Sequence, residues 1–232
     1  MTGPAPQGAR IVETVRVLQS RLCTVYALDP QVDASDFVVD DAARDALRVR
    51  LGALVDLSRE ALLVHESAPS GDDEPELCLA LLLEDSLAEA SVEDDARLDP
   101  WCALLEGVSH LLYVVDRART GRSVSRLELE LQAEVDKYVG VWVSRREAGH
   151  RLDADRLWRR LFEGHRFEAP DAEAVDRYRA ASHFAGRYCR YLGARYLSPR
   201  GPRGLCGLWP EIRRFWRMDQ TEKLGHIEAL PA

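Results

Sequence analysis

The segment from Trp101 to Arg119 limits the fold more than any other, because its apolar residues lie on nearly every side of a helix. They are Leu104, Leu105, Val108, Leu111, Leu112, Val114 and Val115. Such a helix needs other elements around it, which predicts a central core helix. Asp99 and Pro100 suit an N-cap and a first helical residue, and Thr120-Gly121 predicts the end of the helix.

Helical patterns continue from there, so we expect residues 100–232 to form a helical bundle. Ser125 and Glu128 have capping-box spacing ahead of a helix over 126–145. Its inward stripe would be Leu127, Leu131, Val135, Tyr138 and Trp142. Further helices are predicted around 157–162, over 171–197, and as a broken pair over 210–217 and 219–228.

The N-terminal section, residues 10–95, mixes helical and strand patterns. After a disordered start at 1–9, helices are expected over 9–26 and from Asp40 or Asp41 onward, with a short strand over 35–39 between them. The second helix would carry Ala43, Leu47, Leu51 and Leu54 on one side. Two apolar runs near 61–83 predict a hairpin around a turn at 70–75.

The second run of this hairpin, Leu77–Leu83, alternates leucines with Cys78 and Ala80, so a helix could pack closely over its small-residue face. A helix over 77–91 is the competing prediction, since leucine, alanine and glutamate favour helices. The expected fold class is therefore α+β and predominantly helical, with a small helix and hairpin section followed by a helical bundle. We expect the two to pack as one compact body.

Several classes of protein are excluded by what the sequence lacks. No apolar run approaches the length of a membrane span, and the first ten residues do not resemble a secretory signal. The five cysteines are scattered and never form a C-x-x-C pair. We find no P-loop, dinucleotide-binding, G-x-S-x-G or H-E-x-x-H motif. These observations predict a cytoplasmic protein without a membrane partner or a cofactor, and they favour a non-enzymatic role.

Charge is divided unevenly along the chain. Residues 141–232 hold 18 basic and 12 acidic residues, a net of +6, whereas residues 1–140 hold 13 basic and 27 acidic residues, a net of −14. The two parts could complement each other, or the basic end could bind an anionic partner. Only two of the basic residues are lysines, which is typical of GC-rich bacterial coding.

The richest candidate site is the stretch from Arg177 to Arg217, with ten arginines, one acidic residue and eight interleaved aromatic residues. Within its helix, one face would carry Arg179, His183, Arg187 and Arg190, while Val175, Ala185, Cys189 and Leu192 occupy another. Guanidinium groups bind carboxylate or phosphate through paired donors, and aromatic rings can stack on bases. Arg200 and Arg203 would extend this anion-binding surface. Solvated arginines over an aromatic core are the alternative interpretation.

The same helix carries a second motif. Arg177 and His183 have a spacing that resembles the Arg and His signature of HEPN-type ribonucleases. That resemblance covers one helix and implies an RNA-acting helical nuclease that uses these two residues. Tyr178 stands where the HEPN pattern usually has a polar residue, and the predicted hairpin has no place in a plain HEPN bundle.

A third hypothesis is a metal-binding helical bundle that uses Glu106 and His110. They would face Glu128, Glu130, Glu134 and Asp136 on the next helix. Paired metals are usually held by Glu-x-x-His on two helices, whereas this spacing is i, i+4 and occurs once. A hydrogen-bonded core pair of Glu106 and His110 is the alternative, with Glu128 and Glu130 favoured by the helix dipole.

The sequence thus favours a binding or adaptor protein whose basic C-terminal region engages an anionic partner. We expect a protein partner, with nucleic acid as the second class that the basic region fits, and homo-oligomer formation remains open.

Overall fold

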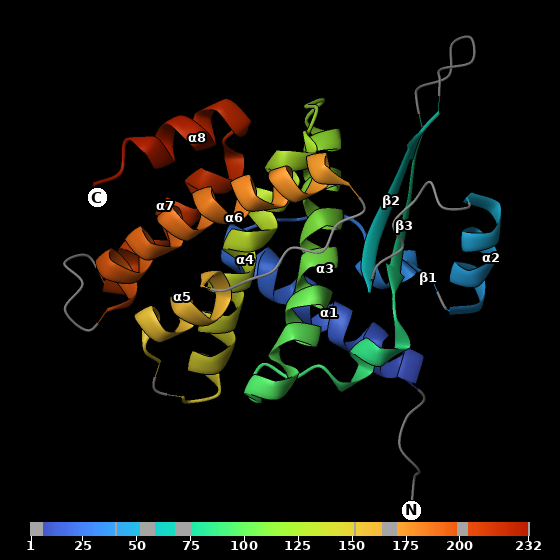
Figure 1. The fold of residues 1–232 in the computed structure, drawn as a ribbon, viewed down its shortest axis with the longest axis horizontal. Coiled ribbons are helices and arrows are strands. Elements are labelled where there is room, and N and C mark those ends of the chain that lie inside the picture. Colours follow the sequence, from blue (N-terminus) through green and yellow to red (C-terminus); the bar gives the residue numbers. More distant parts are fainter. Residues whose placement is uncertain are drawn as a thin grey trace, which may run out of the picture. The chain divides into compact units, whose positions relative to one another are not determined.

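The computed structural model describes residues 7–39, 41–51, 59–67, 76–150, 152–163, 171–198 and 204–231. Its helices are α1 (Gln7–Tyr26), α2 (Asp41–Leu51), α3 (Leu98–Arg119), α4 (Arg126–Glu147), α5 (Ala154–Phe162), α6 (Ala172–Leu192), α7 (Gly204–Arg217) and α8 (Gln220–Glu228). The strands are β1 (Val38–Val39), β2 (Glu60–Glu66) and β3 (Leu77–Leu83). The predominantly helical α+β class is confirmed (Figure 1). No helix in these ranges is both long and apolar enough to cross a membrane.

The chain divides into two compact units, and each contains parts of α1 and α3. Unit 1 consists of residues 1–19 and 31–112, and unit 2 of residues 20–30 and 113–232. Unit 1 has 7 basic and 21 acidic residues, a net of −14. Unit 2 has 24 basic and 18 acidic residues, a net of +6. The charge asymmetry of the sequence therefore coincides with the division into units.

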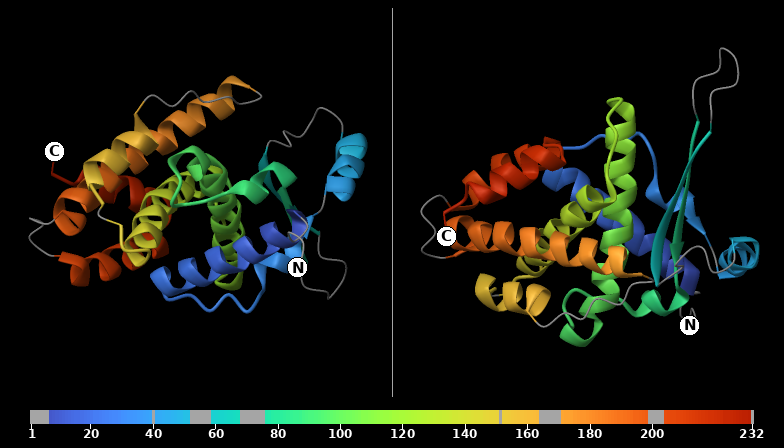
Figure 2. Two further views of the ribbon diagram at one scale, coloured as in Figure 1. Left: turned by 90° about the horizontal axis from the view of Figure 1, so that it is seen from below. Right: turned by 45° about the horizontal axis from the view of Figure 1, so that its top comes forward.

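Unit 1 contains a three-stranded sheet in the order β1-β3-β2. The strands β2 and β3 form the predicted antiparallel hairpin, with Leu62 opposite Leu81, so the competing helix over 77–91 is wrong. β1 pairs in parallel with Leu81 and Leu82 alone, and the other half of the hairpin, 64–66 and 77–79, extends past it (Figures 1 and 2). The predicted turn at 70–75 lies outside the described residues.

The leucine face of the hairpin, rather than its small-residue face, lies closest to α3. A Cβ atom on Gly107 of α3 would lie 2.8 Å from Cδ1 of Leu81 and 2.9 Å from Cγ of Glu60. The close approach that we expected from small residues on the strand thus comes from a glycine on the helix. Because Leu62 pairs with Leu81, the even-numbered residues of β2 lie on this same face of the sheet.

Two details of unit 1 differ from the sequence predictions. On α2, Ala43 of the predicted side is exposed, and the neighbouring Arg44 is unexpectedly buried, with Nη2 3.4 Å from Glu84 Oε1. Asp94 caps a short 3-10 helix, Asp95–Arg97, and α3 already begins at Leu98. Asp99 is therefore inside α3 and is not its N-cap.

Unit 2 is a helical layer structure in which α4 and α6 pack against each other and α5 packs on both (Figures 1 and 2). The predicted α4 stripe is confirmed at Leu131, Val135, Tyr138 and Trp142, which are all buried. Ser125 caps α4 by accepting a hydrogen bond of 3.0 Å from the Glu128 amide. α6 ends in a π-helical turn, Gly193–Leu197, and α7 begins at Gly204 rather than at the predicted 210.

Candidate functional site

The candidate site is the exposed face of α6 in unit 2, and the packing of α6 determines which side chains it presents. Asp171 caps the helix by accepting a 2.7 Å hydrogen bond from the Ala174 amide. The residues that face the core are small or apolar, namely Ala174, Ala181, Ala185, Tyr188, Cys189 and Leu192. Burial of this face leaves the opposite face to solvent. There the structure brings together the four predicted residues Arg179, His183, Arg187 and Arg190, all exposed.

Arg190 is held by a ring rather than by an acid. Its guanidinium carbon lies 4.4 Å from the ring centroid of Trp158 on α5, a cation–π contact. The Trp158 indole in turn donates a 2.6 Å hydrogen bond from Nε1 to the Gly186 carbonyl. Stacking uses the flat face of a guanidinium and leaves the donors around its edge available to a ligand. Trp158 therefore orients Arg190 without consuming its hydrogen-bonding capacity.

Arg187 contacts the C-terminal end of α8. Its Nη2 atom donates to the carbonyls of Leu230 at 2.9 Å and Glu228 at 3.2 Å. Helix carbonyls at a C-terminus lack intrahelical partners and attract cations, so this arginine caps α8. Within the described residues, no group accepts a hydrogen bond from Nε or Nη1 of Arg187. Both atoms are available to a carboxylate.

The other two members of the face differ in their surroundings. Arg179 forms a 3.4 Å ion pair with Asp176 one turn earlier, and both side chains are exposed. His183 lies edge-on to the Phe184 ring, with centroids 5.4 Å apart. Arg200 and Arg203, the two arginines predicted to extend the surface, lie outside the described residues. The basic half of the face is therefore its C-terminal half, from His183 to Arg190.

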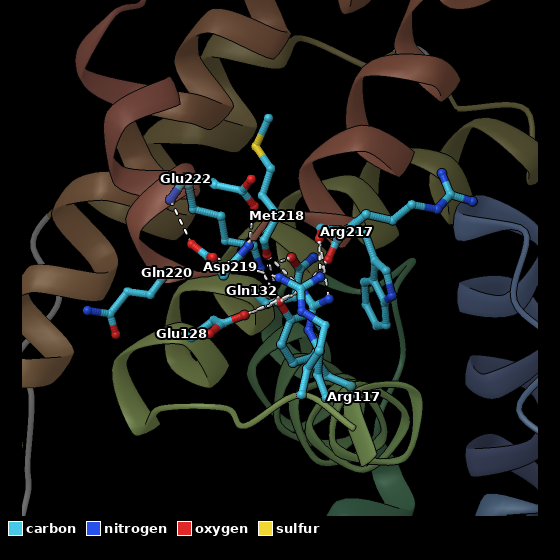
Figure 3. A network of polar contacts seen from close by, with 12 residues as sticks. Arg117, Glu128, Gln132, Arg217, Met218, Asp219, Gln220 and Glu222 are labelled. Atoms are coloured by element: carbon cyan, nitrogen blue, oxygen red, sulfur yellow. Dashed lines mark hydrogen bonds and ion pairs between the residues drawn. The ribbon is translucent and has the colours of Figure 1, made fainter. Parts of the chain in front are cut away.

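Beneath α8, unit 2 holds a buried polar network that the sequence did not predict (Figure 3). Lys223 of α8 is fully buried and donates 2.7 Å hydrogen bonds to Gln132 Oε1 and Tyr113 Oη. Tyr113 donates a 2.6 Å hydrogen bond to Glu128 Oε1. Burial lowers the pKa of Lys223 to about 7, although the carboxylate of Glu128 opposes this change.

Arg117 connects this network to the junction between α7 and α8 (Figure 3). Its Nη2 atom donates to the carbonyls of Trp216 at 2.6 Å and Met218 at 2.7 Å, and it lies 3.4 Å from Glu128 Oε1. Asp219 then starts α8 with a capping box, in which its carboxylate and amide each form a 2.9 Å bond with Glu222. These contacts fix where α7 stops and α8 begins.

The network extends to Tyr26, whose hydroxyl donates to Asp136 Oδ1, while Gln132 donates to the same oxygen at 2.8 Å. Burial and the Asp136 carboxylate raise the pKa of Tyr26. Glu128, Gln132 and Asp136 follow one another at i, i+4 and i+8 on α4. That polar series within a buried helix is the signal by which sequence reasoning could have found the network.

Several of the predicted metal ligands have polar partners within their own unit. His110 of α3 is buried, and Nδ1 lies 3.8 Å from Oε1 of Glu60, a residue of β2 that the sequence prediction did not include. Among the carboxylates expected on the facing helix, Glu128 and Asp136 belong to the buried network, and Glu134 pairs with Lys137 at 2.7 Å. A metal bound by Glu106 and His110 stays a prediction.

Within the described residues, nothing beyond the spacing of Arg177 and His183 supports the HEPN hypothesis. Arg177 lies on α6 with its guanidinium carbon 5.4 Å from the Tyr178 ring, and His183 lies further along the same helix on the exposed face. The hairpin that a plain HEPN bundle lacks is present in unit 1. Comparison with models of protein families, with curated proteins and with solved structures finds no match to this chain.

Proposed function

We propose that this protein is a non-enzymatic binding protein whose α6 face, formed by Arg179, His183, Arg187 and Arg190, engages an acidic surface of a partner protein. One observation carries the proposal. Arg187 and Arg190 lie three residues apart on this exposed face, each is held by a group other than a carboxylate, and each keeps donors available. Side chains at this spacing are neighbours about 5–6 Å apart, which suits a pair of carboxylates.

An acidic protein fits this face better than a nucleic acid does. The first and last of the four residues are eleven positions apart, or about 16 Å along the helix, and the preceding turns carry the exposed acids Glu173 and Asp176. A nucleic acid brings a phosphate every ~3.4 Å per strand in a duplex and would continue past the basic patch onto these acids. A protein can instead place a few carboxylates opposite the basic half alone. The proposal includes the cytoplasmic location expected from the sequence.

The experiment compares three probes at about 150 mM NaCl, a salt concentration that screens weak long-range attraction. They are a ten-residue Glu-rich peptide, a single-stranded oligonucleotide of ten nucleotides and inorganic phosphate. We expect saturable binding of the peptide, weaker binding of the oligonucleotide and none of phosphate. Tighter binding of the oligonucleotide than of the peptide would mean that the partner is a nucleic acid and not a protein.

Variants assign the binding to α6. Arg190→Glu should weaken peptide binding at least tenfold, because it replaces an attraction with a repulsion at one of the two arginines that form the proposed contact. Arg126→Glu is the matched control, since Arg126 is an exposed arginine at the start of α4 and its reversal changes the net charge by the same amount. Equal losses in both variants would mean that net charge alone attracts the peptide, and the proposed site would then be wrong.

A further inference from the structure

Helix α8 contacts the proposed α6 face through Nη2 of Arg187. That atom donates to the carbonyls of Leu230 at 2.9 Å and Glu228 at 3.2 Å, so both of its hydrogens are engaged. A guanidinium group binds one carboxylate most strongly through two parallel hydrogen bonds, either end-on from Nη1 and Nη2 or side-on from Nε and Nη2. Both arrangements use Nη2. While α8 is packed, Arg187 therefore gives a carboxylate separate hydrogen bonds from Nε or Nη1 but no bidentate pair.

In its packed position α8 buries the amine of Lys223 completely. The amine donates 2.7 Å hydrogen bonds to two neutral groups, Oε1 of Gln132 and the hydroxyl of Tyr113. The Glu128 carboxylate instead lies 3.4 Å from Nη2 of Arg117 and accepts a hydrogen bond from Tyr113. Within the described residues, no carboxylate forms an ion pair with Lys223. A charged ammonium here would lose its hydration without gaining an ion pair, so the packed position favours the neutral amine.

Charged groups around this amine act in opposite directions. Two carboxylates of α4 favour its protonated form, those of Glu128 and Asp136. Two guanidinium groups oppose that form, those of Arg117 on α3 and Arg122 just beyond it. Burial has the largest effect and lowers the pKa of Lys223 to about 7, from the ordinary lysine value of 10.5.

Aromatic rings and one further ion pair also surround α8. The ring centroids of Tyr113 and Phe215 lie 4.4 and 5.1 Å from the buried amine, and Tyr188 of α6 stacks on Phe215. His226 of α8 pairs with Glu211 of α7 at 2.8 Å. His226 is a second titratable group on this helix, so its contribution to any pH dependence must be separated from that of the amine.

We propose that protonation of Lys223 releases α8 from its packed position and lets Arg187 bind a carboxylate in bidentate fashion, so that the α6 face holds its acidic partner more tightly as the pH falls from 8.5 to 7. This inference rests on the function proposed for α6. Release transfers the amine to water and withdraws the carbonyls of Glu228 and Leu230 from Nη2. Because the released helix binds a proton at higher pH than the packed helix, release becomes up to about tenfold more favourable per unit of pH decrease.

The first measurement follows α8 in the full-length protein without any ligand. Hydrogen exchange of the Ile227 amide, corrected for the intrinsic exchange rate at each pH, gives the opening constant of the helix. We expect this constant to be at least fivefold larger at pH 7 than at pH 8.5. It should also exceed the opening constant of the Tyr188 amide on α6 at both pH values. Equal constants for the two amides would mean that α8 opens only when the whole unit unfolds, which overturns the proposal.

The second measurement is the affinity for the ten-residue Glu-rich peptide, whose side chains stay ionised at both pH values. We expect binding at least threefold tighter at pH 7 than at pH 8.5. Lys223→Met removes the buried amine and retains every histidine, so both pH dependences should disappear. Arg187→Lys keeps the charge but cannot form a bidentate pair, so the pH dependence of binding should disappear while that of α8 opening remains. Circular dichroism checks that both variants fold.

The outcomes separate this switch from the function on which it rests. Peptide binding of equal strength at both pH values would overturn the switch and leave the α6 site in place. Absence of peptide binding at both pH values would overturn the α6 site and the switch together. A pH dependence of binding that persists in Lys223→Met would belong to another group, such as His183 or His226, and would also overturn the proposal.

Discussion

Arg187 on the exposed face of α6 donates a 2.9 Å hydrogen bond to the carbonyl of Leu230, just beyond the end of α8. The same side chain is thus a member of the proposed binding face and the cap of the last helix. A ligand bound to the proposed face would therefore share one guanidinium group with the C-terminal end of α8. This dual role makes Arg187 a poor choice for testing binding alone, but a useful probe of α8.

The first prediction concerns that cap. Arg187→Ala should loosen the last turn of α8 by about 0.5–1 kcal/mol, a value appropriate for an exposed arginine on helix carbonyls. Hydrogen exchange of the amides from Gly225 to Ala229 should then become roughly two- to fivefold faster. Arg190→Ala is the control, because Arg190 stacks on Trp158 and forms no hydrogen bond or ion pair with α8 in the part of the chain that the structure describes. Equal exchange in the two variants would show that Arg187 does not hold the helix.

The second prediction follows from the buried amine of Lys223, whose pKa is lowered to about 7 from the ordinary lysine value of 10.5. Between these two pH values the unfolded chain binds more protons than the folded chain, so the free energy of unfolding rises with pH. The slope for one such group is at most about 1.4 kcal/mol per pH unit. The stabilisation is present at high pH and is lost as the pH falls toward 7.

Lys223→Met tests this dependence. The variant lacks the titrating amine, so its free energy of unfolding should rise less with pH than that of the wild type. The wild-type value minus the variant value should therefore increase from pH 7 to pH 9. Urea unfolding at several pH values measures it. Methionine loses the hydrogen bonds to Gln132 and Tyr113 at every pH, which lowers stability by an amount that does not vary with pH. Parallel pH profiles would mean that Lys223 is charged in the folded protein.

The third prediction concerns the contact between α3 and the hairpin. Gly107→Ala would place its Cβ atom 2.8 Å from Leu81 Cδ1 and 2.9 Å from Glu60 Cγ, so these side chains must shift. Overpacking of this kind costs about 1–3 kcal/mol, more than the helix propensity that alanine adds. Gly225→Ala is the matched control, because its Cβ atom would meet nothing within 4 Å. Thermal unfolding should show a loss for the first variant and a gain for the second.

Local signals explain why most helices could be predicted from the sequence. The caps at Ser125, Asp171 and Asp219 act within three residues; the structure confirms the predicted cap at Ser125 and shows the same type of cap at the other two positions. The hairpin was predictable for a similar reason, since its two strands differ clearly in periodicity from the helices around them. These features depend on neighbours in the sequence, so no knowledge of the tertiary fold was needed.

The features that sequence reasoning missed depend on distant partners. Lys223 meets Tyr113 across 110 positions of the chain, and no local pattern specifies that meeting. On α2, Arg44 is buried with Nη2 3.4 Å from Glu84 Oε1, a residue 40 positions along the chain, and no local pattern indicates that burial. For the site, the α6 face was predictable from spacing, whereas the ring of Trp158 that orients Arg190 was not.

The central claim is that localised positive charge on α6 recognises an acidic protein surface. Its most direct test is a charge swap. The double variant Arg179→Glu, Arg190→Glu should lose binding of the Glu-rich peptide and gain binding of a Lys-rich peptide of equal length, as measured by calorimetry. Arg126→Glu should behave as the wild type does. A double variant that still prefers the Glu-rich peptide would contradict the account, because the recognition would then lie elsewhere on the protein.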